Sequence, residues 1–188
     1  MSGAINTFPS LAAQWADIRH LDFEERPLTG GGAVFHAGQY RYLLWRQWNT
    51  CQPLLCFIML NPSKADADRD DPTSTRCNNR AIALGFGGVL VVNLFAYRAT
   101  DPRQMKLMMD PVGRWNDDAI RFALSHAGMT IAAWGQDGRH RDRQLDVIAI
   151  AKDAGARLHH LGLTKDGLPR HPLYIARDMY PVAWEDAA

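Results

Sequence analysis

Three stretches of the chain are almost wholly apolar and show no alternation with polar residues, and they constrain the fold more than any other feature. They are residues 54–60 (LLCFIML), 88–95 (GVLVVNLF) and 129–134 (MTIAAW). A strand with one solvated face alternates apolar and polar residues, whereas a strand buried on both faces does not. Together with a shorter run at residues 157–163, they predict a central, mainly parallel four-stranded sheet that is covered on both faces.

Helical patterns separate these runs, so crossover helices rather than hairpins should join the strands. Four helices are expected, at residues 10–20, 74–84, 116–127 and 141–154. Asn116 is the expected N-cap of the third of them. Two short strands at residues 33–36 and 39–45 predict an N-terminal hairpin on the edge of the sheet. The expected fold is therefore an α/β three-layer sandwich.

The length of 188 residues fits one domain with a full core. Within it we expect an N-terminal helix and loop (residues 1–32), a core (33–175) and a C-terminal tail (176–188). Hydrophobic residues make up 47% of the chain and charged residues 22%, which is typical of globular rather than disordered proteins.

The cysteines and the apolar runs bear on the cellular compartment. Cys51, Cys56 and Cys77 are odd in number and lack C-x-x-C spacing, which predicts reduced thiols in a cytoplasmic protein. No apolar run approaches the ~20 residues that cross a bilayer. The N-terminus lacks the basic start and apolar stretch of a secretory signal. We therefore expect no membrane partner.

The formal net charge of +1 limits the kind of nucleic acid that the chain can bind. A protein that binds a long stretch of backbone usually has a clear basic excess, because its affinity comes largely from neutralised phosphates. Any surface for nucleic acid is therefore expected to be a local patch.

Polar side chains gather in the loops that follow the predicted strands, whereas the opposite strand ends carry mainly glycine and alanine. In open parallel sheets, ligands bind outside the carboxyl ends of the strands. The residues expected to catalyse there are Asn61 and His171. Those expected to bind the ligand are Ser63, Asn93, Tyr97, Arg98, Trp134, Gly135, Arg139 and Arg170.

Asn61 and Asn93 each lie at or near the end of an apolar strand. A carboxamide has donors and an acceptor, so it can read the edge of a base or orient a water molecule. An asparagine in a loop can equally cap or tie a neighbouring turn. Because the two asparagines follow adjacent strands, we favour a shared site.

His171 and the turn at residues 135–141 (GQDGRHR) each allow two interpretations. Near neutral pH a histidine can move a proton or donate to a developing oxyanion, but it can also be a solvated loop residue. The turn joins a strand to a helix, where backbone N–H groups and Arg139 suit a phosphate. A flexible basic turn without a ligand explains the same residues equally well.

Four aspartates in residues 66–71 (DADRDD) have the early spacing of a calcium-binding loop. The sixth position is Asp71 rather than glycine, and the twelfth is Cys77 rather than glutamate. We therefore favour a solvated acidic loop over a metal site and expect no metal or cofactor. If the loop folds back, one of these aspartates supplies a carboxylate to the pocket.

Six motifs occur in order along the chain: residues 58–63 (IMLNPS), 70–73 (DDPT), 92–102 (VNLFAYRATDP), 110–113 (DPVG), 133–135 (AWG) and 170–174 (RHPLY). Together they resemble the signature of a bacterial and phage family of unknown function, the domain of unknown function 1643. The resemblance runs from about Tyr40 to Tyr174 and implies no settled activity.

The strand-end motifs also resemble, more weakly, those of the uracil-DNA glycosylase superfamily, especially its mismatch-specific branch. That resemblance implies that Asn61 positions a water molecule, that Asn93 lies near the base-reading position and that His171 stabilises the base oxyanion. Two departures stand out. Ser63 replaces a glycine, and residues 173–174 replace a serine-rich segment that wedges into duplex DNA. Base flipping from a duplex requires such a wedge and a basic groove.

Two functions therefore stay open from the sequence. The first is an enzyme that cleaves an N-glycosidic bond in a nucleotide or modified base, with Arg139, Arg141 or Arg170 holding phosphate. The second is a non-catalytic module that binds a nucleobase, a nucleotide or a nucleic-acid fragment. The enzyme requires Asn61 and His171 to face one cavity. The sequence gives no indication of the oligomeric state.

Overall fold

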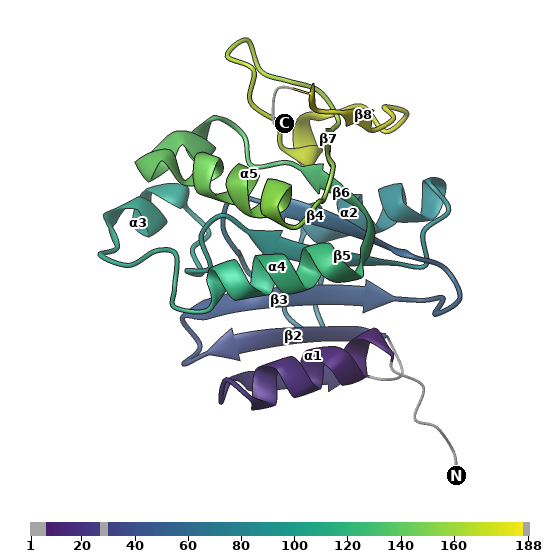
Figure 1. Cartoon of the computed structure of the whole chain (residues 1–188), viewed down its shortest axis with the longest axis vertical. Helices are drawn as coiled ribbons and strands as arrows, with labels where there is room; N and C mark the ends of the chain where they lie inside the picture. The colour runs from purple at the N-terminus through teal and green to yellow at the C-terminus, as the bar shows by residue number, and fades with distance from the viewer. Residues whose placement is uncertain (1–6, 27–29, 186–188) are drawn as a thin grey trace.

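The computed structural model describes residues 7–26 and 30–185 (Figure 1), and this part of the chain contains one mixed sheet of eight strands in the order β1-β2-β3-β5-β4-β6-β7-β8. The strands are β1 (Asp22–Arg26), β2 (Gly31–His36), β3 (Tyr40–Gln47), β4 (Leu54–Met59), β5 (Gly88–Asn93), β6 (Ala127–Ala132), β7 (Leu158–His160) and β8 (Val182–Ala183). The helices are α1 (Phe8–Asp17), α2 (Pro72–Ala83), α3 (Pro102–Leu107), α4 (Asn116–His126) and α5 (Arg143–Asp153), with the 3₁₀ turns η1 (Gln136–Asp142) and η2 (Pro172–Tyr174).

Four neighbouring strands form the parallel centre of the sheet. β4 pairs in parallel with β5 on one side and with β6 on the other, and β6 pairs in parallel with β7. Every residue of β4 and β5 is buried, because both faces of these strands are covered. The parallel pairing predicted from residues 54–60 and 88–95 is thus confirmed.

The sheet is larger and more mixed than the four strands expected from the sequence. The β2–β3 hairpin exists, but it is not an edge, because β3 pairs antiparallel with β5 and β1 pairs antiparallel with the outer side of β2. At the opposite edge β8 pairs antiparallel with β7, so the segment expected to be a tail contributes a strand. β1 (DFEER) and the two-residue β8 lack the apolar alternation that marks a strand in a sequence.

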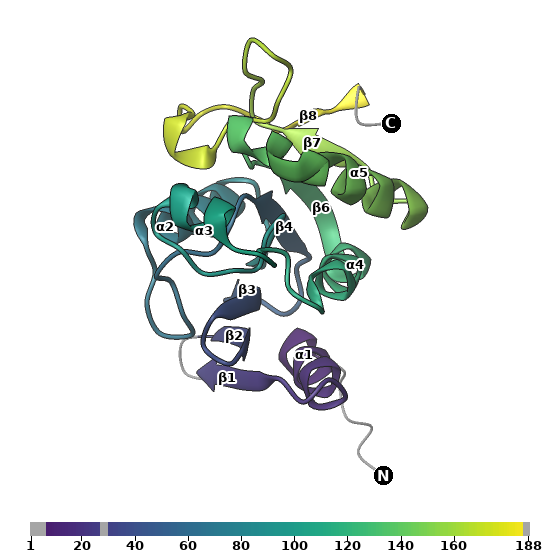
Figure 2. The same cartoon turned by 90° about the vertical axis from the view of Figure 1, so that its left-hand side faces the viewer.

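Helices cover both faces of the sheet, as Figure 2 shows with α2 on one side and α1, α4 and α5 on the other. One hydrophobic cluster joins the sheet to α1, α4 and α5 through residues such as Trp15, Ile120 and Val147. A second cluster joins the other face to α2 through Cys77 and Ala81. The sheet is therefore the middle layer of three. Across residues 7–26 and 30–185, no helix combines the length and the apolar character needed to cross a bilayer.

Helix α2 begins where the sequence provides a cap and a proline. Asp71 Oδ1 accepts a hydrogen bond from the Ser74 backbone N–H at 2.8 Å. Pro72 occupies the first helical position, where no backbone donor is required. These two residues fix the start of α2, and with it the position of the Asp71 carboxylate.

Helix α4 differs from the expectation at its first residue. Trp115 takes the N-cap position, and Asn116 lies inside the helix. The buried Asn116 carboxamide instead donates to the carbonyl oxygens of Asn93 and Leu94, at 3.0 and 2.8 Å. It therefore ties α4 to the end of β5 rather than capping its own helix.

Candidate functional site

A pocket of about 750 Å³ opens beyond the carboxyl ends of the parallel strands. Its walls come from β3, from the loops that follow β4, β5, β6 and β7, and from the first turn of α2. The charged side chains of the lining are Arg41, Lys64, Asp71, Asp137 and Arg170, together with the titratable His171. This is the side of the sheet on which the sequence placed the polar loops.

Six of the ten residues expected to form the site line this pocket: Asn61, Ser63, Trp134, Gly135, Arg170 and His171. They come from three different strand-end loops, which the fold brings together. Trp134 is only 2% exposed and forms part of the wall, with its ring 5.7 Å from that of Trp184.

The four other expected residues do not line the pocket. Asn93 is 1% exposed. The Tyr97 ring packs edge-on against another tyrosine, at 5.8 Å. The guanidinium of Arg98 lies over the Phe35 ring at 5.0 Å. Arg139 donates to the Asp166 carbonyl at 3.1 Å, so the basic turn at residues 135–141 uses this arginine to hold a loop.

Asn61 joins two of the pocket loops and leaves one atom available. Its Nδ2 donates to the Ala99 carbonyl at 2.7 Å and to the Pro62 carbonyl at 3.1 Å. Within residues 7–26 and 30–185 its Oδ1 has no hydrogen-bond partner. With the amide nitrogen fixed in this way, Oδ1 is the atom that can accept from a ligand or a water molecule.

The His171 ring is held by its own backbone turn. Nδ1 accepts a long hydrogen bond from the Leu173 N–H, at 3.4 Å. A neutral imidazole that accepts at Nδ1 carries its proton on Nε2. Burial lowers the pKa of His171 below its ordinary value of 6.5, and the charge of Asp71 offsets part of that effect. The residue therefore offers a neutral Nε2–H donor near pH 7.

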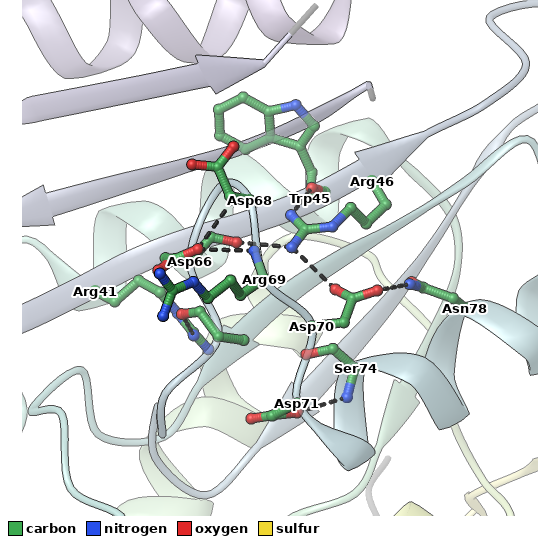
Figure 3. Close-up of polar contacts among 11 residues, drawn as sticks. Arg41, Trp45, Arg46, Asp66, Asp68, Arg69, Asp70, Asp71, Ser74 and Asn78 are labelled. Carbon is green, nitrogen blue, oxygen red and sulfur yellow. Dashed lines mark hydrogen bonds and ion pairs between the residues drawn. The ribbon is translucent and has the colours of Figure 1, made fainter. Parts of the chain in front are cut away.

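Only one of the four aspartates in the acidic loop, Asp71, lines the pocket. Figure 3 shows polar contacts of all four. Asp66 Oδ1 accepts from two backbone N–H groups of its own loop, at 2.9 and 2.8 Å. Asp68 pairs with Arg26 at 2.7 Å. Asp70 pairs with Arg46 at 2.9 Å. Asp71 caps α2 through Oδ1, and its second oxygen has no hydrogen-bond partner in the described residues. The loop is therefore exposed at residues 68–70, as expected, and all four of its carboxylates are also held by hydrogen bonds or ion pairs.

The described residues contain no group of three or more His, Cys, Asp or Glu side chains that could hold a metal ion. Asp68 and Asp70 have their negative charges matched by arginine side chains.

Arg41 is a functional candidate that the sequence did not single out. It lies in β3, is 3% exposed and lines the pocket. Nη1 donates to the Ala65 carbonyl at 2.6 Å, whereas Nε has no partner in the described part of the chain. No carboxylate of the described residues lies within ion-pair distance of it. Burial lowers the pKa of Arg41 to about 10, and the charge of Asp71 opposes that shift.

The charges of the pocket do not balance. Arg41, Lys64 and Arg170 form no ion pair with any carboxylate of the described residues. Of the two acidic residues in the lining, Asp137 is paired with Lys106 outside it, at 2.6 Å, which leaves Asp71. Three cations thus face one free carboxylate. Lys64 and Arg170 are exposed, but Arg41 is buried, and because a buried cation without a counterion is costly, an anionic ligand would stabilise it.

Comparison with known protein families gives one match. Residues 41–173, well over half of the chain, match the family described as "Protein of unknown function (DUF1643)". The chain belongs to the DUF1643 family. No curated protein and no solved structure matches it. None of these comparisons supports the weaker resemblance to the uracil-DNA glycosylase superfamily.

The DUF1643 region and the pocket occupy the same part of the chain. The match begins at Arg41 and ends at Leu173, and the pocket lining runs from Arg41 to Tyr174. α1, β1 and β2 before the match, and β8 after it, contribute nothing to the lining. The segment shared by the family is therefore the segment that builds the pocket.

Gly135 in this DUF1643 protein has a backbone conformation that other residues do not tolerate, with φ 73° and ψ −168°. A Cβ added there meets no atom within 4 Å, so the penalty for a side chain is backbone strain alone. Gly135→Ala is expected to lower the free energy of unfolding by about 1–3 kcal/mol, as measured by urea denaturation.

Gly155→Ala is the matched control for this prediction. Gly155 also has open space around its Cβ position, with φ 64°. It ends α5 in a Schellman motif, in which its N–H donates to Lys152 at 3.0 Å and that of Ala156 to Ala151 at 2.9 Å. Other residues can enter that left-handed region, so the loss should be smaller. An equal or larger loss at Gly155 would contradict the argument.

Proposed function

We propose that this DUF1643 protein binds a nucleotide-like anion in its pocket and hydrolyses the N-glycosidic bond of that ligand. The observation that carries the proposal is the buried, unpaired Arg41 in a pocket that also contains Asn61, Asp71 and His171. The proposal includes a uracil-DNA-glycosylase-like architecture, which the four parallel strands with helices on both faces support.

The pocket has the size and the chemistry to bind a base together with a phosphate. Its volume of about 750 Å³ lies within the range of pockets for small molecules. Met59, Leu60 and Trp134 provide an apolar wall for a base. Arg41 and Arg170 provide guanidinium groups, which recognise phosphate through two parallel hydrogen bonds.

Asn61, Asp71 and His171 can share the chemical step. The bond between the sugar carbon and the base nitrogen breaks first, and its electron pair leaves with the base. His171 donates Nε2–H to the base where that charge develops. A water molecule held at Asn61 Oδ1 then bonds to the sugar carbon, and Asp71 takes its proton. A carboxamide alone is too weak a base for this step.

The binding half of the proposal is tested with Arg41→Met. Thermal-shift titration of the wild type with a nucleoside, a nucleoside monophosphate and inorganic phosphate should give the largest stabilisation with the monophosphate. Arg41→Met should bind the monophosphate about 10- to 150-fold more weakly, because a hydrogen bond to a charged group contributes about 1.5–3 kcal/mol.

Arg46→Met is the matched control. Arg46 lies on the same strand and donates to the neighbouring loop carbonyl, that of Asp66, at 2.7 Å, but it lies outside the pocket lining. Its substitution should reduce stability and leave the affinity unchanged. If no nucleotide stabilises the wild type, or if the two variants bind equally well, the proposal is wrong. Binding without release of a free base from any nucleotide would support the non-catalytic alternative.

A further inference from the structure

A second hollow, of about 410 Å³, lies on the outer side of α2 and adjoins the pocket. Pro72 and Leu173 line both cavities and so belong to the wall between them. Arg76, Arg80 and Arg177 lie in the lining of the second hollow, which we call the α2 groove. None of its lining residues is acidic.

Arg80 builds the α2 groove. It is 5% exposed, and its Nη atoms donate to the carbonyl oxygens of Met179 and, at 2.9 Å, of Ala176. These bonds hold the segment after η2 against α2 and bring Arg177 into the same hollow as Arg76. Burial lowers the pKa of Arg80, and the positive charge of the nearby Arg76 lowers it further.

The other two arginines are free to bind a ligand. Arg76 and Arg177 have no ion pair and no side-chain hydrogen bond among residues 7–26 and 30–185. Asp178 acts on Arg80 through its charge but does not line the groove. Asn79, which is exposed, adds an amide donor to the lining. This combination suits a phosphodiester, whose two non-bridging oxygens accept hydrogen bonds from a planar guanidinium.

We propose that the α2 groove binds the backbone phosphates of a single-stranded nucleic acid whose terminal or unpaired nucleotide occupies the pocket. This inference rests on the proposed function and narrows its substrate from a free nucleotide to a nucleotide within a strand. The wall between the cavities supports it, because Leu173 is 37% exposed and the adjacent Tyr174 is 73% exposed. An exposed aromatic ring beside a cationic groove is the usual platform on which an unpaired base stacks.

The net charge of the chain favours a short single strand over a duplex. The formal charge of +1 gives the chain no overall basic excess, and the unpaired cations of the pocket (Arg41, Lys64 and Arg170) and of the groove (Arg76 and Arg177) lie close to the shared wall residues. Duplex binding depends on many phosphate contacts along a long face. A strand that reaches only the pocket and the groove makes few such contacts, so its affinity should depend modestly on salt.

The test is fluorescence anisotropy with the full chain and a fluorescein-labelled thymidine oligomer of about ten nucleotides, within the site sizes of single-strand binders. Each lost phosphate contact removes about 0.7 from the slope of log K against log salt. Because the double variant Arg76→Ala/Arg177→Ala loses two such contacts, it should bind the oligomer about 25-fold more weakly at 0.1 M salt. The matched control is Arg114→Ala/Arg121→Ala, which removes the same charge beside and within α4, on the opposite face of the sheet.

Separate measurements distinguish the two proposals. The monophosphate thermal shift should be the same in the groove variant and the wild type, because Arg76 and Arg177 lie outside the pocket. If that shift is present while the groove and control variants bind the oligomer equally, the groove inference is wrong and the proposed function stands. If polyglutamate competes as well as the oligomer, the groove is a general polyanion site and the inference is also wrong. Tighter binding of the matching duplex than of the single strand would contradict it too.

Discussion

Asp71→Asn is expected to lower the rate of base release by about 10²–10⁴-fold, the usual contribution of a positioned general base. The substitution removes the negative charge but keeps an oxygen that can accept from the Ser74 N–H, and asparagine caps helices as well as aspartate does. The start of α2 and the fold should therefore survive. The measurement is the turnover of a nucleotide that stabilises the wild type, with the urea midpoint as the check on folding.

Asp70→Asn provides the matched control for this experiment. Asp70 is the neighbouring carboxylate, but it pairs with Arg46 and accepts from Asn78 at 2.7 Å, outside the pocket lining. Its substitution should change stability slightly and leave turnover intact. If Asp70→Asn lost turnover and Asp71→Asn kept it, the general base would not be Asp71.

His171→Ala is expected to reduce turnover by about 10²–10³-fold, the scale measured for the loss of one oxyanion donor, with ligand affinity largely kept. Because burial lowers the pKa of His171, its neutral form should persist to lower pH than in an ordinary histidine, and turnover should fall where protonation of Nδ1 breaks the hydrogen bond from Leu173 that orients the ring. His160→Ala is the control, since burial also lowers the pKa of His160 but this residue lies in β7, outside the pocket lining. If His160→Ala removed turnover and His171→Ala did not, the donor would be misassigned.

The same pKa shift makes a prediction about stability. Below pH 6.5 the unfolded chain takes up a proton at His171 more readily than the folded chain does. The free energy of unfolding should therefore fall as pH drops from 6.5 through the lowered pKa of the folded state. His171→Ala should show a smaller fall over this range in urea denaturation.

The side of the molecule that holds the pocket was predictable, because it depends only on strand direction. Apolar runs without alternation identified β4 and β5 as parallel strands, and parallel strands place their following loops at one edge. Asn61, Gly135 and His171 directly follow such strands or lie in the last loop, so they line the pocket together. Asn93 differs. It is the last residue of β5, pairs with Met59, and has a carboxamide that is buried beneath the surface.

The electrostatics of the pocket were not predictable from the sequence. Arg41 and Arg46 lie on the same strand and look alike in the sequence, yet one lines the pocket and the other forms an ion pair. The difference arises because the acidic loop folds back over β3. The same fold-back separates Asp71 from its three neighbours, and local spacing carries no information about such a contact.

The order in which the pocket residues occur along the chain has a consequence for biosynthesis. Its walls start at Arg41 and are complete only once the chain has reached Tyr174. A ribosome adds about 5–20 residues per second, and folding proceeds from the N-terminus as the chain emerges. The antiparallel hairpin can form early, whereas β4 waits for β6 before its second edge is covered. During that interval an apolar strand edge is open to other nascent chains, so slow translation of this part or a premature stop before β6 should lead to aggregation.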